Sequence, residues 1–174
     1  MTAESQSQSK EDADFRAAEA ELAMAIGRVV IHFNNLERDL GELLAALLES
    51  KNSFVQTALV ASMSFSQKVG LLAALYLEKF KDDSERCDAC RSSIQKLRSL
   101  DEERNRYVHS CFGTKTFGSS EFLRTKPKTK GAKGLSVARE DVDIQAMKAL
   151  KDRISSFSWL ELTELYRGCI ELRG

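Results

Sequence analysis

The fold of this chain is decided by residues 22–47, which read LAMAIGRVVIHFNNLERDLGELLAAL. Apolar residues recur in this stretch in alternating steps of four and three, at Leu22, Ile26, Val29, Phe33, Leu36, Leu40, Leu43 and Leu47. This spacing places a single apolar seam along one side of a helix, because an α-helix completes a turn every ~3.6 residues. Such a long seam is typical of a bundle helix or of a coiled-coil-like contact.

Further helices are predicted downstream of this seam. Ser53 with Gln56, and Ser64 with Gln67, have the spacing of a capping box that opens a helix, and Asp82 with Glu85 marks another start. The inward residues expected after Ser64 are Phe65, Val69, Leu72, Tyr76 and Phe80, and those after Asp82 are Ile94, Leu97, Leu100, Val108 and Cys111, with an end near Gly113. A last helix is predicted from about Glu140, with its seam at Met147, Leu150, Ile154, Phe157 and Leu165.

The remaining segments have a different composition. Residues 1–10 are polar and without pattern, which predicts a disordered lead-in. Residues 113–137 contain glycines, serines and the only proline, which predicts a loop or a small β-hairpin. We therefore expect an all-α protein with one domain over residues 11–174. Its architecture would be an antiparallel bundle of four to five helices, with the loop or hairpin between the last two.

The charge of the chain is balanced overall but unevenly distributed. Lysine and arginine together number 26, and so do aspartate and glutamate. Between Gly113 and Arg139, however, seven cations face one acid, Glu121. No apolar run approaches the ~20 residues that cross a bilayer, and acids near the N-terminus are unlike a signal peptide. We expect a cytoplasmic protein that does not contact membranes.

The four cysteines do not predict a metal site. Cys87 and Cys90 form a C-x-x-C pair within a helical pattern, and no second pair or neighbouring histidine completes a zinc site. We interpret them as helix residues and expect no cofactor.

An unusual polar segment interrupts the apolar stripe of the helix that follows Asp82. Asp101, Arg104, Asn105 and His109 fall with Val108 within an arc of about 140°, at ~100° per residue. Burying such groups is costly unless they are paired or face a cleft. Two interpretations remain open: an internal ion pair of Arg104 with Asp101 beside an incidental His109, or a functional site.

Residues 104–109, RNRYVH, resemble the R-x4-H motif of the HEPN superfamily in the form where a polar residue follows the arginine. Three longer features are also similar to prokaryotic HEPN-type proteins: the F-x-x-L-E pattern at Phe33 to Glu37, FSQKVGLL at residues 65–72, and LRSLDEERNRYVHS at residues 97–110. The resemblance covers roughly residues 21–109.

This resemblance implies a helical bundle and a metal-independent endoribonuclease. Active members usually work as homodimers in which two motifs line a shared cleft, so the resemblance assigns Arg104, Asn105 and His109 to the catalytic site. Some members belong to toxin–antitoxin or antiviral systems, and an antitoxin partner modifies a tyrosine two positions after the histidine. Here that position is Cys111, which departs from the pattern.

The residue types suit this chemistry. RNA supplies its own nucleophile, the 2′-hydroxyl, and an imidazole such as His109 can exchange protons near neutral pH. The planar guanidinium of Arg104 can stabilise phosphate charge with two donors, while Asn105 orients the histidine or a phosphate oxygen. We expect Asp101 and Glu37 to support the site, with Glu37 holding Arg104. Candidate RNA contacts are Arg106, Arg124, Lys126, Lys128 and Lys130.

Alternatives remain at this point. The basic residues 124–130 could belong to a solvated loop without RNA contacts. The chain could be a catalytically inactive HEPN-like dimer that binds nucleotide or RNA or serves protein interaction, or an unrelated helical scaffold that dimerises through the seam of residues 22–47. His32 has no role assigned, since it lies at the edge of the expected core.

Overall fold

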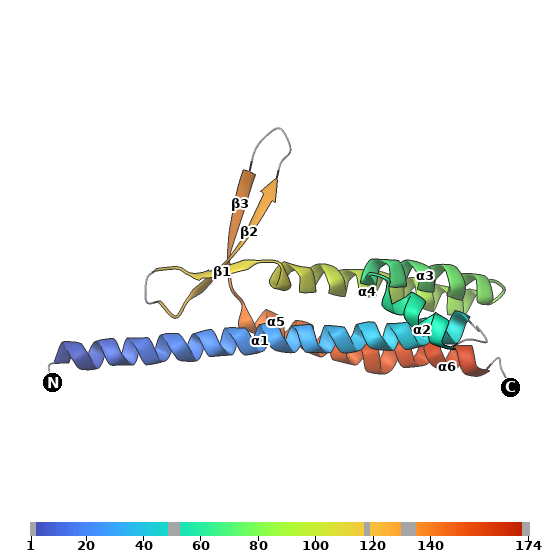
Figure 1. Cartoon of the computed structure of the whole chain (residues 1–174), viewed down its shortest axis with the longest axis horizontal. Coiled ribbons are helices and arrows are strands. Elements are labelled where there is room, and N and C mark those ends of the chain that lie inside the picture. Colours follow the sequence, from blue (N-terminus) through green and yellow to red (C-terminus); the bar gives the residue numbers. More distant parts are fainter. Residues whose placement is uncertain (1–2, 49–52, 117–118, 130–134, 172–174) are drawn as a thin grey trace. The chain divides into compact units, whose positions relative to one another are not determined.

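The computed structural model describes residues 3–48, 53–116, 119–129 and 135–171 (Figure 1). The chain divides into two compact units, and the single domain expected over residues 11–174 stays a prediction. The first unit consists of Met1–Val30 and Arg104–Ala149, and the second of Ile31–Glu103 and Leu150–Gly174. Helices α1, α4 and α5 each contribute residues to both units.

Helix α1 spans Ala3–Leu48 and carries the predicted seam. Every seam residue is buried except Ile26, which is partly exposed. The helix begins at Ala3, so residues 3–10 are helical where a disordered lead-in was expected. This start is physically reasonable because residues 3–10 contain no glycine or proline and can extend a helix that is already nucleated.

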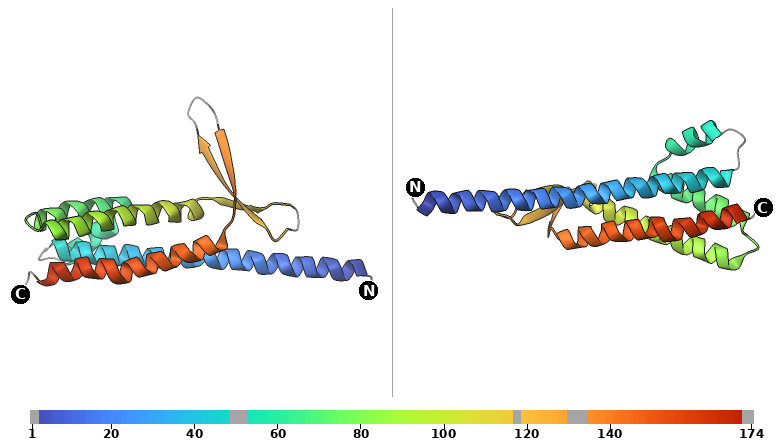
Figure 2. Two further views of the ribbon diagram at one scale, coloured as in Figure 1. Left: turned by 180° about the vertical axis from the view of Figure 1, so that it is seen from behind. Right: turned by 90° about the horizontal axis from the view of Figure 1, so that it is seen from below.

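The second unit is a bundle of helices. It contains residues 31–48 of α1, α2 (Ser53–Ala61), α3 (Phe65–Lys79), most of α4 (Ser84–Val108), most of α5 (Ile144–Phe157), the π-helix η2 (Ser158–Leu162) and α6 (Thr163–Glu171). Figures 1 and 2 show α3 beside α4, and the C-terminal part of α1 beside α6. Fully buried side chains from these helices form the core: Phe33, Leu36, Leu40, Leu43, Leu44, Leu72, Leu97, Leu150 and Ile154.

The helix starts follow local capping chemistry. The capping box at Ser64 is confirmed, since the Gln67 amide donates to Ser64 Oγ at 3.4 Å and the Ser64 amide donates to Gln67 Oε1 at 2.8 Å. Helix α4 begins one residue later than an Asp82 cap would place it, because Asp83 Oδ1 accepts from the amide of Arg86 at 3.0 Å. Asp143 caps α5 in the same way, so the last helical segment begins at Ile144 rather than near Glu140.

The first unit contains a three-stranded antiparallel sheet where a loop or hairpin was expected. Its strands are β1 (Cys111–Thr114), β2 (Phe122–Thr129) and β3 (Leu135–Asp141), in the order β1-β2-β3. Helix α4 ends at Val108, so Cys111 lies exposed in β1 and not inward on a helix. The ring of Phe15 on α1 packs against the ring of Phe122 on the central strand, with ring centroids 6.1 Å apart.

Only the base of this sheet is three strands wide. The four residues of β1 pair with residues 122–125 of β2, whereas β2 and β3 remain paired out to Thr129 and Leu135. Residues 126–129 and 135–138 therefore form a two-stranded extension, called here the distal hairpin, which extends away from β1 in Figure 1. Across the described ranges, none of the helices has the length and apolar character needed to cross a bilayer.

Candidate functional site

Arg104 and Asn105 lie within the last five residues of α4, at the junction with the sheet of the first unit. The Arg104 guanidinium donates from Nη1 to Asn105 Oδ1 at 2.7 Å, and both side chains are partly buried. This bond turns the carbonyl oxygen of the Asn105 amide toward the guanidinium. Arg104 and Asn105 thus form a hydrogen-bonded polar pair on the helix.

His109 lies just beyond the helix, because α4 ends at Val108. Its side chain is exposed, and its amide donates to the carbonyl of Asn105 at 3.3 Å. The predicted helical arc therefore applies to Arg104 and Asn105, while His109 sits at the turn into β1. The exposed imidazole meets the basic requirement of a group that exchanges protons with a bound polymer.

The two residues expected to support the site belong to the second unit. Asp101 lies on α4 and is partly buried. Glu37 is bonded to Lys68 of α3, with Glu37 Oε1 2.7 Å from Lys68 Nζ. Since Lys68 is only 7% exposed, its ammonium group needs this carboxylate as a counter-charge. Lys68 is thus the partner of Glu37 within the second unit, and the expectation that Glu37 holds Arg104 stays a prediction.

The predicted RNA-contacting residues fall into two groups. Arg106 is exposed on α4 and Lys126 is partly exposed on β2; the backbone of Lys128 belongs to β2, and Lys130 lies outside the described residues. Arg124, in contrast, is only 8% exposed. It donates to the carbonyl of Arg106 and pairs with Glu140 across the β2–β3 register, so its guanidinium is engaged within the protein and not presented to solvent.

Two further ion pairs lie at the base of the sheet. Lys115, which follows β1, lies 3.0 Å from Glu121 Oε2 and 3.0 Å from Asp141 Oδ1. Hydrogen bonds to these two carboxylates raise the pKa of Lys115 above its ordinary value. The acids near the sheet are thus paired at its base.

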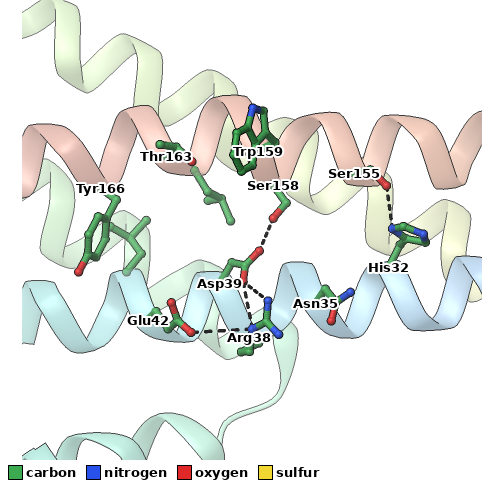
Figure 3. Close-up of a pocket in the computed structure, with 12 residues that line it drawn as sticks. His32, Asn35, Arg38, Asp39, Glu42, Ser155, Ser158, Trp159, Thr163 and Tyr166 are labelled. Carbon is green, nitrogen blue, oxygen red and sulfur yellow. Dashed lines mark hydrogen bonds and ion pairs between the residues drawn. The ribbon is translucent and has the colours of Figure 1, made fainter.

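The second unit contains a polar pocket that sequence reasoning missed. Figure 3 shows this pocket, a cavity of about 550 Å³ between α1 and the segment from the end of α5 to α6. Ser155 Oγ is 2.8 Å from His32 Nδ1, and Ser158 donates to Asp39, which also pairs with Arg38. Its signal in the sequence is the polar series His32, Asn35, Asp39 and Glu42, which runs along α1 beside the apolar seam.

The cysteines of the helical bundle are packed as small apolar residues. Cys87, Cys90 and Cys169 are buried, and Cys87 Sγ donates to the carbonyl of Phe80 at 3.2 Å. Desolvation by burial is the main cause that raises the pKa of Cys90 to about 11, with contributions from the neighbouring Cys87 and Cys169. Within the described ranges, no three side chains of the metal-binding types gather to hold an ion.

Thiol labelling should separate the cysteines by position. With an aromatic disulfide reagent at pH 8, we expect Cys111 to react rapidly, because it is exposed on β1. The three buried thiols should react only as fast as the bundle opens, since the thiolate is the reactive species and Cys90 stays protonated well above pH 8. Loss of the rapid phase in Cys111→Ser is the matched control, and three rapidly reacting thiols in that variant would contradict the burial.

The motif residues, the sheet that borders them and the polar pocket thus make up the candidate sites of the described chain. Comparisons with models of known protein families, with curated proteins and with solved structures find no significant match to this sequence.

Proposed function

We propose that the chain is a metal-independent endoribonuclease of the HEPN type, with Arg104, Asn105 and His109 as its catalytic residues. One observation supports this proposal most directly: the Arg104 guanidinium is oriented by Asn105, and an exposed His109 follows at the end of the same helix. A guanidinium can stabilise charge on the phosphate and an imidazole can exchange protons, and cleavage by the RNA 2′-hydroxyl uses both effects.

The proposed reaction is an in-line transfer at the scissile phosphate. The RNA 2′-oxygen forms a bond to phosphorus, the bond from phosphorus to the 5′-oxygen breaks, and the leaving oxygen takes up a proton. His109 exchanges protons with these oxygens, while Arg104 donates two hydrogen bonds to the phosphate oxygens as negative charge builds up. In a homodimer with a shared cleft, the partner's motif supplies a second imidazole, so that one histidine accepts a proton and the other donates one.

The distal hairpin is proposed as the RNA-contacting arm. Four lysines and no acid lie between Arg124 and Arg139, namely Lys126, Lys128, Lys130 and Lys133. Lys126 and Lys128 lie on this two-stranded ribbon, and positive charge there suits contact with a phosphate backbone, because each neutralised phosphate releases a counterion.

Replacing Lys126, Lys128 and Lys130 by glutamine should weaken RNA binding and flatten its dependence on salt. The slope of log K against log salt should fall by about 2, since each lost contact to a single strand contributes ~0.7. Fluorescence anisotropy with a labelled single-stranded RNA at several salt concentrations measures this change. An unchanged slope would show that these lysines make no RNA contacts.

The function is tested by cleavage of a defined RNA with and without EDTA. We expect cleavage in both, with 2′,3′-cyclic phosphate and 5′-hydroxyl ends on the products, and no cleavage by the double variant Arg104→Ala/His109→Ala prepared in parallel. Activity that disappears with EDTA and returns with Mg²⁺ would contradict the mechanism. RNA binding without cleavage would favour the alternative function of an inactive HEPN-like binding module.

Light scattering tests the homodimer, and expression in bacteria tests a role as a toxin or defence component. We expect the natural sequence, but not the double variant, to slow growth. A growth effect relieved by a co-expressed neighbouring gene would identify an antitoxin partner.

A further inference from the structure

Arg124 is buried where the end of α4 meets the sheet, and its guanidinium contacts other groups of the protein. Its Nη1 lies 2.7 Å from the carbonyl oxygen of Arg106, its Nη2 pairs with Glu140, and its Cζ lies 5.6 Å from the centroid of the Tyr107 ring. Three different groups therefore hold one guanidinium. Lysine could not reproduce these contacts, because they use a planar group with several donors.

The carbonyl that Arg124 contacts belongs to the end of α4. The last four carbonyls of a helix have no partner within the helix and need one from elsewhere. In α4, the carbonyl of Asn105 accepts from the amide of His109 and that of Tyr107 accepts from the amide of Ser110. The carbonyl of Arg106 accepts from Arg124 and from the Ser110 hydroxyl. Arg124 thus provides a partner for the helix end from a different element, β2.

His109 lies between two attachments to the same strand. On one side, Arg106 is bonded to Arg124 of β2. On the other side, Cys111 pairs with Thr125, the next residue of β2, and its carbonyl accepts from Thr125 Oγ1 at 3.2 Å. The four residues 107–110 therefore lie between two contacts with β2, one to Arg124 and one to Thr125. These contacts hold the backbone on both sides of His109.

We propose that Arg124, together with Glu140 and Tyr107, is a positioning clamp that holds the end of α4 and sets the placement of His109 relative to Arg104. Arg124 is a positioning residue and not a catalytic one, since its burial keeps it from contacting RNA. For its effect on cleavage the proposal rests on the proposed function, whereas its effect on the backbone follows from the contacts alone.

The catalytic arm of the test compares Arg124→Gln with Arg139→Gln. Arg139 lies on β3 opposite Thr125 and is exposed, so both variants lose one positive charge from the same sheet. We expect Arg124→Gln to lower kcat by about a hundredfold, because misplacing a catalytic group by an ångström costs about that much. Its KM and the salt dependence of RNA binding should stay unchanged, and Arg139→Gln should keep kcat. A rise in KM at unchanged kcat would show that Arg124 contacts RNA, and would overturn the proposal.

The structural arm requires no activity. Hydrogen exchange followed by NMR reports the amides of His109 and Ser110, whose acceptors lie in the last turn of α4. Arg124→Gln should speed their exchange by about tenfold or more, with Arg139→Gln unchanged, since local opening depends on the contacts that hold a segment. Unchanged exchange in Arg124→Gln overturns the clamp.

Glu140→Ala is the second variant, in case Arg124→Gln fails to fold. It removes one of the three contacts at a side chain that is 53% exposed, and should speed exchange of the same two amides by a smaller factor. Exchange equal to that of the natural sequence would count against the clamp. If the natural chain cleaves no RNA, the proposed function fails, while the exchange experiment still decides the clamp.

Discussion

Replacing His109 by alanine is expected to lower the rate of RNA cleavage by about a thousandfold, within the ~10²–10⁴-fold range of general acid–base catalysis. The imidazole is exposed at the end of α4, so its removal takes away the proton-exchanging group and leaves no buried cavity. Binding of the RNA should change little, because the hairpin lysines remain. Single-turnover cleavage of a labelled RNA measures the rate, and anisotropy measures the affinity.

The chain supplies its own control for this experiment. It contains two histidines, and the other, His32, lies in the second unit against Ser155. His32→Ala should keep the cleavage rate. Arg104→Ala should lower the rate by about 10²–10³-fold through the loss of charge stabilisation on the phosphate. Equal rates for His109→Ala and the natural sequence would remove His109 from the mechanism.

Replacing Phe33 by alanine is expected to reduce the free energy of unfolding by about 3–5 kcal/mol. Phe33 is fully buried in the second unit, and its ring packs against that of Phe65 with centroids 4.7 Å apart. The variant loses both the transfer free energy of the ring and its packing contacts, because a core of helices relaxes only partly around a cavity. Urea unfolding followed by circular dichroism measures the difference.

Phe54 is the matched control for this prediction, since it is a phenylalanine of the same unit that is 78% exposed on α2. Phe54→Ala should change the free energy of unfolding by less than about 0.5 kcal/mol. If Phe33→Ala fails to fold, Phe33→Leu keeps most of the volume and should lose only about 1–1.5 kcal/mol. Equal losses for Phe33→Ala and Phe54→Ala would contradict the described core.

Local patterns in the sequence were sufficient for the helices of the bundle. The seam from Leu22 to Leu47 predicted the buried side of α1, because the period of an α-helix fixes which side chains share a face. Ser64 and Gln67 predicted the start of α3, because a capping box is made entirely of residues three positions apart. Periodicity could not place the end of α4, since Val108 and Cys111 continue the apolar spacing after the helix has ended.

The sheet and the role of Arg124 depend on contacts between distant residues. Cys111 pairs with Thr125, and Arg124 pairs with Glu140, so that positions 14 and 16 residues apart come together. Patterns within a short stretch of sequence do not predict such pairing. The positive charge of Arg124, Lys126 and Lys128 made all three candidate RNA contacts. It did not reveal that the first of them would be buried against the end of α4.

By itself, the sequence determined where the long helices run, which of their faces are apolar and that Arg104, Asn105 and His109 lie close along the chain. Only the tertiary structure decided that Glu37 pairs with Lys68, that His109 falls at a turn and that Arg124 is buried. The physical reason is that helical period and capping act over a few residues. The partner of a charged side chain, in contrast, is selected by the desolvation cost and the counter-charges of the folded chain.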